Sequence, residues 1–195
     1  LSLDELLETI LAIPMTEEER LFCFSEMYLD LLSTLPYKKS INLIRQVHCI
    51  EEQIERTVNL LGHKVIYIDN KRIIIEDNVF ANESAQVVTE FADEKEALSI
   101  LEYNHFSNKG NIERKKEILK RIADLLEPWR KPLNKSNELK GLLKVNNDKI
   151  QALEKLFYMY NKFNIRHNNE EQMLTGLSNQ EIESWYDKVY TLSLF

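Results

Sequence analysis

The chain has 195 residues, of which 44% are apolar, and it contains only four Gly and four Pro. This apolar content supplies a core and argues against wholesale disorder. The scarcity of turn residues argues against a β-sandwich or barrel, which needs many tight turns. The net charge of −7 does not favour indiscriminate binding to a polyanion. Composition therefore predicts a soluble, mainly α-helical protein.

The cysteines and the hydropathy pattern point to a cytoplasmic location. Cys23 and Cys49 stand apart with no CxxC spacing, which is typical of buried thiols in a reducing compartment. No apolar run approaches the roughly 20 residues of a membrane span. We therefore expect no membrane association, no metal and no small-molecule cofactor. The chain starts at Leu1, and its apolar end, Thr191–Phe195, predicts that a longer protein continues beyond it.

The first third of the chain predicts helices. Ser2–Glu5 and Thr16–Glu19 read as capping boxes, in which a hydroxyl and a carboxylate each satisfy a free helical N–H. A second helix is expected from Glu17 to Thr34, and it carries an apolar stripe of Leu21, Phe24, Tyr28, Leu31 and Leu32. A third helix is expected from Lys39 or Ser40 to Leu61, with Gly62 as its C-terminal cap. Residues 1–62 are predicted to form an N-terminal helical region.

The pattern then changes to β-structure. Lys64–Ile68 and Arg72–Glu76 are β-branched runs separated by a short polar turn, which predicts a β-hairpin. A lone hairpin is marginal in water, so we expect it to lean on the helices or on a neighbouring subunit. We expect an irregular stretch from Asn78 to Glu90, with Gln86–Thr89 as a short third strand. Residues 63–92 are thus predicted to be a hairpin and connector.

The last hundred residues predict four helices joined by short connections. They are expected from about 93 to 106, from 111 to about 128, from 147 to about 164, and from 179 onward. Asp93–Glu96 and Ser178–Glu181 are further capping boxes. Short connections between helices are typical of an antiparallel bundle, which is the architecture predicted for residues 93–195.

One basic segment lies in this acidic molecule. Residues 109–144 contain eleven Lys and Arg against five Asp and Glu. The helix that begins there should turn its basic residues outward, including Lys115, Lys116 and Arg121. A charged outward face is usually just solvated, and the alternative is a groove for RNA phosphates. Under that alternative these three residues bind the substrate.

A cluster of Arg, His and Asn follows the helix that starts near residue 147. Arg166 offers a fixed cation and His167 a proton carrier, with Asn164, Asn168 and Asn169 as neighbouring amides. Metal-free RNA cleavage needs a base, an acid and a cation that stabilises the charged phosphorane. The alternative is structural, because such side chains also satisfy the last carbonyls of a helix and favour its negative dipole end.

With its polar Arg-centred motif between the last two helices, the segment 93–195 resembles the HEPN superfamily. These are compact helical domains of abortive-infection, toxin–antitoxin and other defence systems, which often act as dimers. The family motif is an Arg, then a polar residue, then a His four to six residues beyond the Arg. Arg166 and His167 match the first two positions, and Gln172 stands where the second His is expected.

Two functional hypotheses follow from the sequence. In the first, a bacterial defence-type protein binds and cleaves RNA without metal, with Arg166 and His167 as catalytic residues and Asn164, Asn168 and Asn169 orienting the substrate. In the second, the helical domain is a non-catalytic module that dimerises or senses a partner, which the missing second His favours. Both hypotheses include a homodimer.

Overall fold

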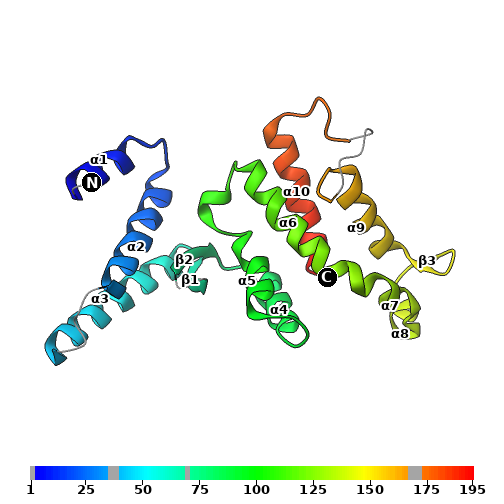
Figure 1. Cartoon of the computed structure of the whole chain (residues 1–195), viewed down its shortest axis with the longest axis horizontal. Helices are drawn as coiled ribbons and strands as arrows, with labels where there is room; N and C mark the ends of the chain where they lie inside the picture. The colour runs from blue at the N-terminus through cyan, green and yellow to red at the C-terminus, as the bar shows by residue number, and fades with distance from the viewer. Residues whose placement is uncertain (1–2, 35–39, 69–70, 167–172) are drawn as a thin grey trace. The chain divides into compact units, whose positions relative to one another are not determined.

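The computed structural model describes residues 3–34, 40–68, 71–166 and 173–195 of the chain. The chain separates into two compact units, which are described one at a time. The N-terminal unit comprises Leu1–Asp77 and Asn104–Ser107, and the C-terminal unit comprises Asn78–Tyr103 and Asn108–Phe195. Each is mainly helical, as the composition predicts (Figure 1).

The N-terminal unit consists of three helices and a β-hairpin. Its elements are α1 (Leu3–Ala12), α2 (Glu17–Thr34), α3 (Ile41–Leu60), β1 (His63–Ile68) and β2 (Lys71–Glu76). The capping box at the start of α2 is confirmed, because Thr16 N donates to Glu19 Oε2 at 2.8 Å and Glu19 N donates to Thr16 Oγ1 at 3.1 Å. The one predicted at Ser2–Glu5 lies outside the described residues. Gly62 follows α3 with φ of +73°, as expected for a helix-ending glycine.

The predicted β-hairpin is confirmed, and it packs on α2 and α3. β1 and β2 pair antiparallel, with Ile68 opposite Lys71 next to the turn. Ile74 is fully buried with Phe22 of α2 and Val58 of α3, and these three residues form the centre of a small core. The hairpin therefore belongs with the N-terminal helices, which differs from the separate segment 63–92 expected from the sequence.

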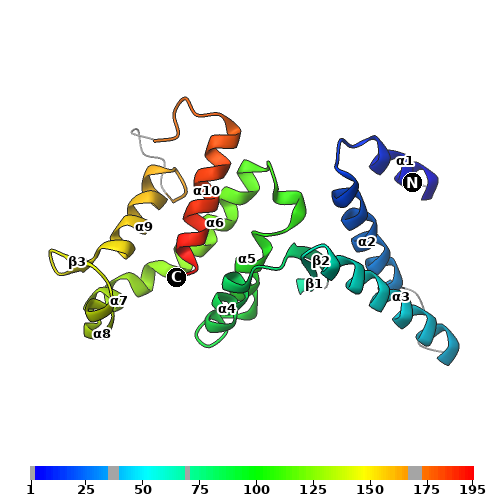
Figure 2. The same ribbon diagram turned by 180° about the vertical axis from the view of Figure 1, so that it is seen from behind.

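The C-terminal unit is longer and has the larger core. Its elements are α4 (Val79–Val88), α5 (Glu94–Glu102), α6 (Ile112–Leu126), α7 (Arg130–Lys135), α8 (Asn137–Leu142), β3 (Val145–Asn146), β4 (Lys149–Ile150), α9 (Gln151–Lys162) and α10 (Asn179–Ser193), with a 3-10 turn at Glu127–Trp129. α6 and α10 lie side by side, as both views show (Figures 1 and 2). The capping boxes at Asp93–Glu96 and Ser178–Glu181 are confirmed.

Two parts of this unit differ from the sequence-based expectation. The predicted strand Gln86–Thr89 is wrong, because these residues form the end of α4 and the cap that follows it. Asn78 caps this helix by accepting from Ala81 N at 3.1 Å. The short β3–β4 hairpin was not predicted; its turn places Asn147 and Asp148 at φ of 49° and 61°. Asn and Asp tolerate this left-handed conformation better than other side chains.

The two cysteines lie on neighbouring helices of the N-terminal unit. Cys23 is partly buried in α2, and Cys49 is exposed on α3. Neither cysteine forms a disulfide. Among the described residues, no helix combines the length and the apolar character needed to cross a bilayer.

Candidate functional site

Arg166 is placed by the turn that ends α9. Asn164 adopts a left-handed φ of 56°, which reverses the chain after the helix. The N–H groups of Ile165 and Arg166 then both donate to the carbonyl of Tyr160, at 3.0 and 3.2 Å. Ile165 is buried and fastens the turn to the core. The backbone therefore caps the helix, so the Arg166 side chain is left to make other contacts.

The Arg166 guanidinium is held by carboxylates at the end of α6 and in the 3-10 turn that follows it. Its Nη1 lies 2.5 Å from Glu127 Oε2, and its Nε lies 3.7 Å from Asp124 Oδ1. The side chain is only 15% exposed, and its guanidinium lies 6.0 Å from the ring centroid of Phe157. One cation thus faces two carboxylates against an aromatic ring. An incoming phosphate would have to displace Glu127 and would meet the negative charge of Asp124.

The remaining residues of the predicted catalytic cluster cannot be placed beside it. His167, Asn168 and Asn169 lie outside the described residues. Arg166 alone cannot serve as an acid or base, because a guanidinium does not lose its proton in proteins. The described part of the cluster is therefore a charge-paired anchor between α9 and the end of α6.

A second ion pair continues this anchor along α9. Arg130 donates from Nε and Nη2 to the two carboxylate oxygens of Glu154, at 3.2 and 2.7 Å. Its guanidinium also lies 4.7 Å from the Phe157 ring. The hydrogen bond from Arg130 holds the pKa of the Glu154 carboxyl below its usual value, and a hydrogen bond from Asn134 adds to this effect. Two guanidinium groups thus lie near one buried phenyl ring.

The prediction that Lys115 faces outward is wrong. The residue is 7% exposed, and its Nζ lies 2.7 Å from both Glu183 Oε1 and Asp187 Oδ1 of α10. Tyr103 donates its hydroxyl to the same Asp187 oxygen at 2.8 Å. Burial raises the pKa of this hydroxyl, and the Asp187 charge raises it further. Lys115 cannot reach an RNA phosphate because it is the buried centre of a network that joins α6 and α10 to Tyr103, the residue after α5.

The other residues of the predicted RNA groove are also engaged. Arg121 Nη2 lies 3.0 Å from Glu102 Oε2 of α5. Arg114 forms an ion pair with the other oxygen of Glu102 and also with Glu117. Lys116 is half-buried. The sequence gives no local signal for these pairings, since Glu102 lies 12 residues from Arg114 and 19 from Arg121.

The C-terminal unit exposes a group of aromatic side chains along α4. Ala81, Ala85 and Val88 are buried on the inner side of this helix. Successive residues of an α-helix lie about 100° apart, so Phe80 and Val87, which directly precede Ala81 and Val88, lie together on one flank of α4. Phe91 follows the helix. Phe80 is 52% exposed, Val87 55% and Phe91 44%. This face of α4 is thus apolar yet open to solvent.

Other aromatic residues extend this face at its two ends. The ring of Phe195 lies 5.1 Å from that of Phe80, and Phe195 is 84% exposed. The ring of Trp129 lies 5.0 Å from that of Phe91, and Trp129 is 40% exposed. We name Phe80, Val87, Phe91, Trp129 and Phe195 the aromatic surface. This surface was not predicted from the sequence, because Asn78–Glu90, which contains α4, was expected to be irregular.

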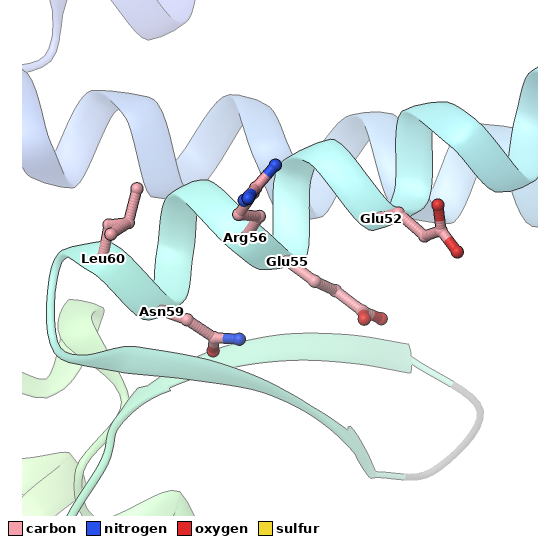
Figure 3. Close-up of a pocket in the computed structure, with 5 residues that line it drawn as sticks. All are labelled: Glu52, Glu55, Arg56, Asn59 and Leu60. Atoms are coloured by element: carbon pink, nitrogen blue, oxygen red, sulfur yellow. The ribbon is translucent and has the colours of Figure 1, made fainter.

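Within the described ranges, no group of His, Cys, Asp and Glu side chains is arranged to hold a metal ion. A pocket of about 530 Å³ lies on α3 and is lined by Glu52, Glu55, Arg56, Asn59 and Leu60 (Figure 3). Comparison with protein-family models, curated proteins and solved structures finds no match for this chain.

Proposed function

We propose that the C-terminal unit is a non-catalytic interaction module, a helical bundle that forms a homodimer through its aromatic surface. The observation that carries this proposal is the exposure of Phe80, Phe91, Trp129 and Phe195 on one unit. Exposed apolar patches of this kind mark interaction sites, and aromatic residues dominate the binding energy of interfaces. Self-association covers such a patch without requiring any further partner.

The charge pattern supports a non-catalytic role. Arg166, the cation of the predicted active site, is paired with Glu127 and Asp124. The buried Lys115 is likewise paired with two carboxylates. Cations paired in this way join helices and stabilise the bundle, and they leave little positive field for a polyanion.

The oligomeric state of the protein tests this proposal. Sedimentation equilibrium of the whole chain should give a dimer, and the double variant Phe80→Ser with Phe91→Ser should weaken it by at least about tenfold. Leu142→Ser is the matched control, because Leu142 is equally apolar and 82% exposed but lies on α8. A wild-type protein that stays monomeric at concentrations on the order of 100 µM would overturn the proposal.

A second candidate function is metal-independent RNA cleavage at Arg166. It is supported by the buried Nε of Arg166, which lacks a hydrogen-bond partner within the described residues. The surplus of basic residues over 109–144 also supports it, since Lys120, Lys131 and Lys135 of this segment are exposed. In this function Arg166 leaves Glu127 to contact phosphate, and His167 transfers the proton.

Labelled RNA distinguishes the two candidates. Cleavage that persists in EDTA and is lost in both Arg166→Ala and His167→Ala would favour the nuclease. RNA that stays intact with the wild-type protein, together with a dimer that the aromatic variants disrupt, would favour the interaction module. Lys120→Ala serves as a control for general loss of positive charge.

A further inference from the structure

The two edges of the β-hairpin in the N-terminal unit differ in whether their outward backbone N–H groups are hydrogen-bonded. The outer N–H groups of β2 are all engaged: Arg72 N donates to Asp30 Oδ1 at 3.3 Å, and Ile74 N donates to Glu26 Oε1 at 2.5 Å. Glu76 N donates to the carbonyl of Asn104 at 3.0 Å. Two carboxylates of α2 and the segment Asn104–Ser107 thus close this edge. Covering an edge in this way prevents another strand from pairing with it.

Among the residues that the structure describes, none covers the outer edge of β1 in this way. In an antiparallel pair, the backbone N–H and C=O groups of two opposite residues point either both toward the other strand or both away from it. Arg72 and Ile74 point away from β1, so their partners Tyr67 and Val65 point away from β2. Within the described residues, no hydrogen bond reaches the outward N–H groups of Val65 and Tyr67. β1 therefore presents an open edge.

Acidic side chains of α3 lie on one side of this edge. α3 packs on the hairpin face that carries Val65 and Ile74. The pocket on α3 described above is lined by Glu52 and Glu55 among others, and Glu55 and Asn59 point from α3 toward the hairpin (Figure 3). A strand added to β1 would place every second side chain toward these carboxylates.

The opposite side of the edge carries two isoleucines beside Lys64. Ile66 and Ile68 of β1 point to the hairpin face away from α3, because side chains alternate along a strand. We propose that the open edge of β1 binds an extended segment of a partner protein in which basic and apolar residues alternate. The backbone of this segment pairs with Val65 and Tyr67, its basic side chains face Glu52 and Glu55, and its apolar side chains face Ile66 and Ile68.

The charge of the N-terminal unit favours this partner over a second copy of the chain. The unit carries fourteen Asp and Glu against eight Lys and Arg. Pairing β1 with β1 of another copy would bring two acidic units together, which like-charge repulsion opposes. A basic segment gains from the same field.

The first test separates the backbone of β1 from its side chains. The probe is a fluorescent peptide of about six residues in which Lys and Val alternate, titrated against the whole chain. Tyr67→Pro removes an outward N–H that the hairpin does not use, and we expect it to weaken binding by about tenfold or more. Tyr67→Thr removes the exposed ring but keeps the N–H, so it should bind as the wild type does. Circular dichroism verifies that both variants fold.

The second test reverses the charge of the acidic side chains on α3. Glu52→Lys combined with Glu55→Lys should weaken the Lys–Val peptide and strengthen a matched Glu–Val peptide. Equal binding of the two peptides by the wild type, or binding of neither, overturns the proposal. So does equal binding by Tyr67→Pro and Tyr67→Thr. A dimer that Tyr67→Pro converts to monomer would show that the edge pairs with a second copy instead.

Discussion

At the scale of the residue, Lys115 shows how a position on a helix decides the role of a charge. Its neighbours on the buried stripe of α6 are Ile118, Leu119 and Ile122. A lysine at such a position must find carboxylates, since an unpaired buried charge is costly. Glu183 and Asp187 meet this need.

Replacing Lys115 should therefore destabilise the C-terminal unit. Lys115→Ala leaves Glu183 and Asp187 without their cation, and we expect the free energy of unfolding to fall by about 3 kcal/mol. Urea denaturation followed by tryptophan fluorescence measures this loss, because Trp129 and Trp185 both lie in this unit. Lys120→Ala, on the exposed side of the same helix, should change stability by less than about 0.5 kcal/mol. Similar losses in the two variants would contradict the assignment.

The sequence indicates the position of some charged residues but not their partners. Arg166 was identified as the centre of a polar cluster, but its partner Glu127 is 39 residues away and no spacing rule connects them. Lys115 carried a readable signal, because it stands three and four residues before Ile118 and Leu119 in the apolar stripe. Local patterns therefore reveal which face a residue occupies, whereas the partner of a charge depends on tertiary packing.

At the scale of the element, predictions succeeded where side chains close the ends of helices. The capping boxes at Thr16, Asp93 and Ser178 each satisfy free N–H groups within four residues. Their geometry therefore depends only on the local sequence. α4 was missed because Val87, Val88 and Thr89 favour strands. The burial of Ala81 and Ala85 against α5 overrides that preference.

The link between α7 and α9 should be sensitive to acid. The pKa of Glu154 is lowered in the folded state, chiefly by its hydrogen bond from Arg130. Its stabilising contribution is therefore complete above the ordinary pKa of about 4.5 and is lost as the pH falls through the lower, folded-state pKa. Glu154→Gln should cost about 1–2 kcal/mol at neutral pH and little in strong acid.

Parallel denaturation curves of wild type and Glu154→Gln across this pH range check the expectation. Glu83→Gln is the control, because Glu83 is an exposed carboxylate on α4. A stability difference that stays constant as the pH falls would show that the ionised carboxylate of Glu154 is not the source of the effect.

At the scale of the whole molecule, the two units differ in the size of their cores. Among the described residues, the main buried cluster of the C-terminal unit has nineteen members, whereas that of the N-terminal unit has three. Since stability grows with buried apolar area, the N-terminal unit should unfold at lower denaturant concentration.

The cysteines and tryptophans make this difference measurable. In a Cys49→Ser background, the partly buried Cys23 of α2 reports opening of the N-terminal unit by its reaction with a thiol reagent. Tryptophan fluorescence reports the C-terminal unit. The thiol transition should precede the fluorescence transition. Coincident curves would mean that both units unfold as one cooperative body.

The segment Asn104–Ser107 has a consequence for how the protein is made. It follows α4 and α5 in the chain, yet it completes the N-terminal unit: His105 bridges Ile75, and its Nε2 lies 2.9 Å from Glu26 Oε1. Nascent chains emerge from the ribosome in order, and domains usually fold as they appear. Here the N-terminal unit cannot be completed until Asn104–Ser107 are translated, and by then translation of the C-terminal unit has already begun.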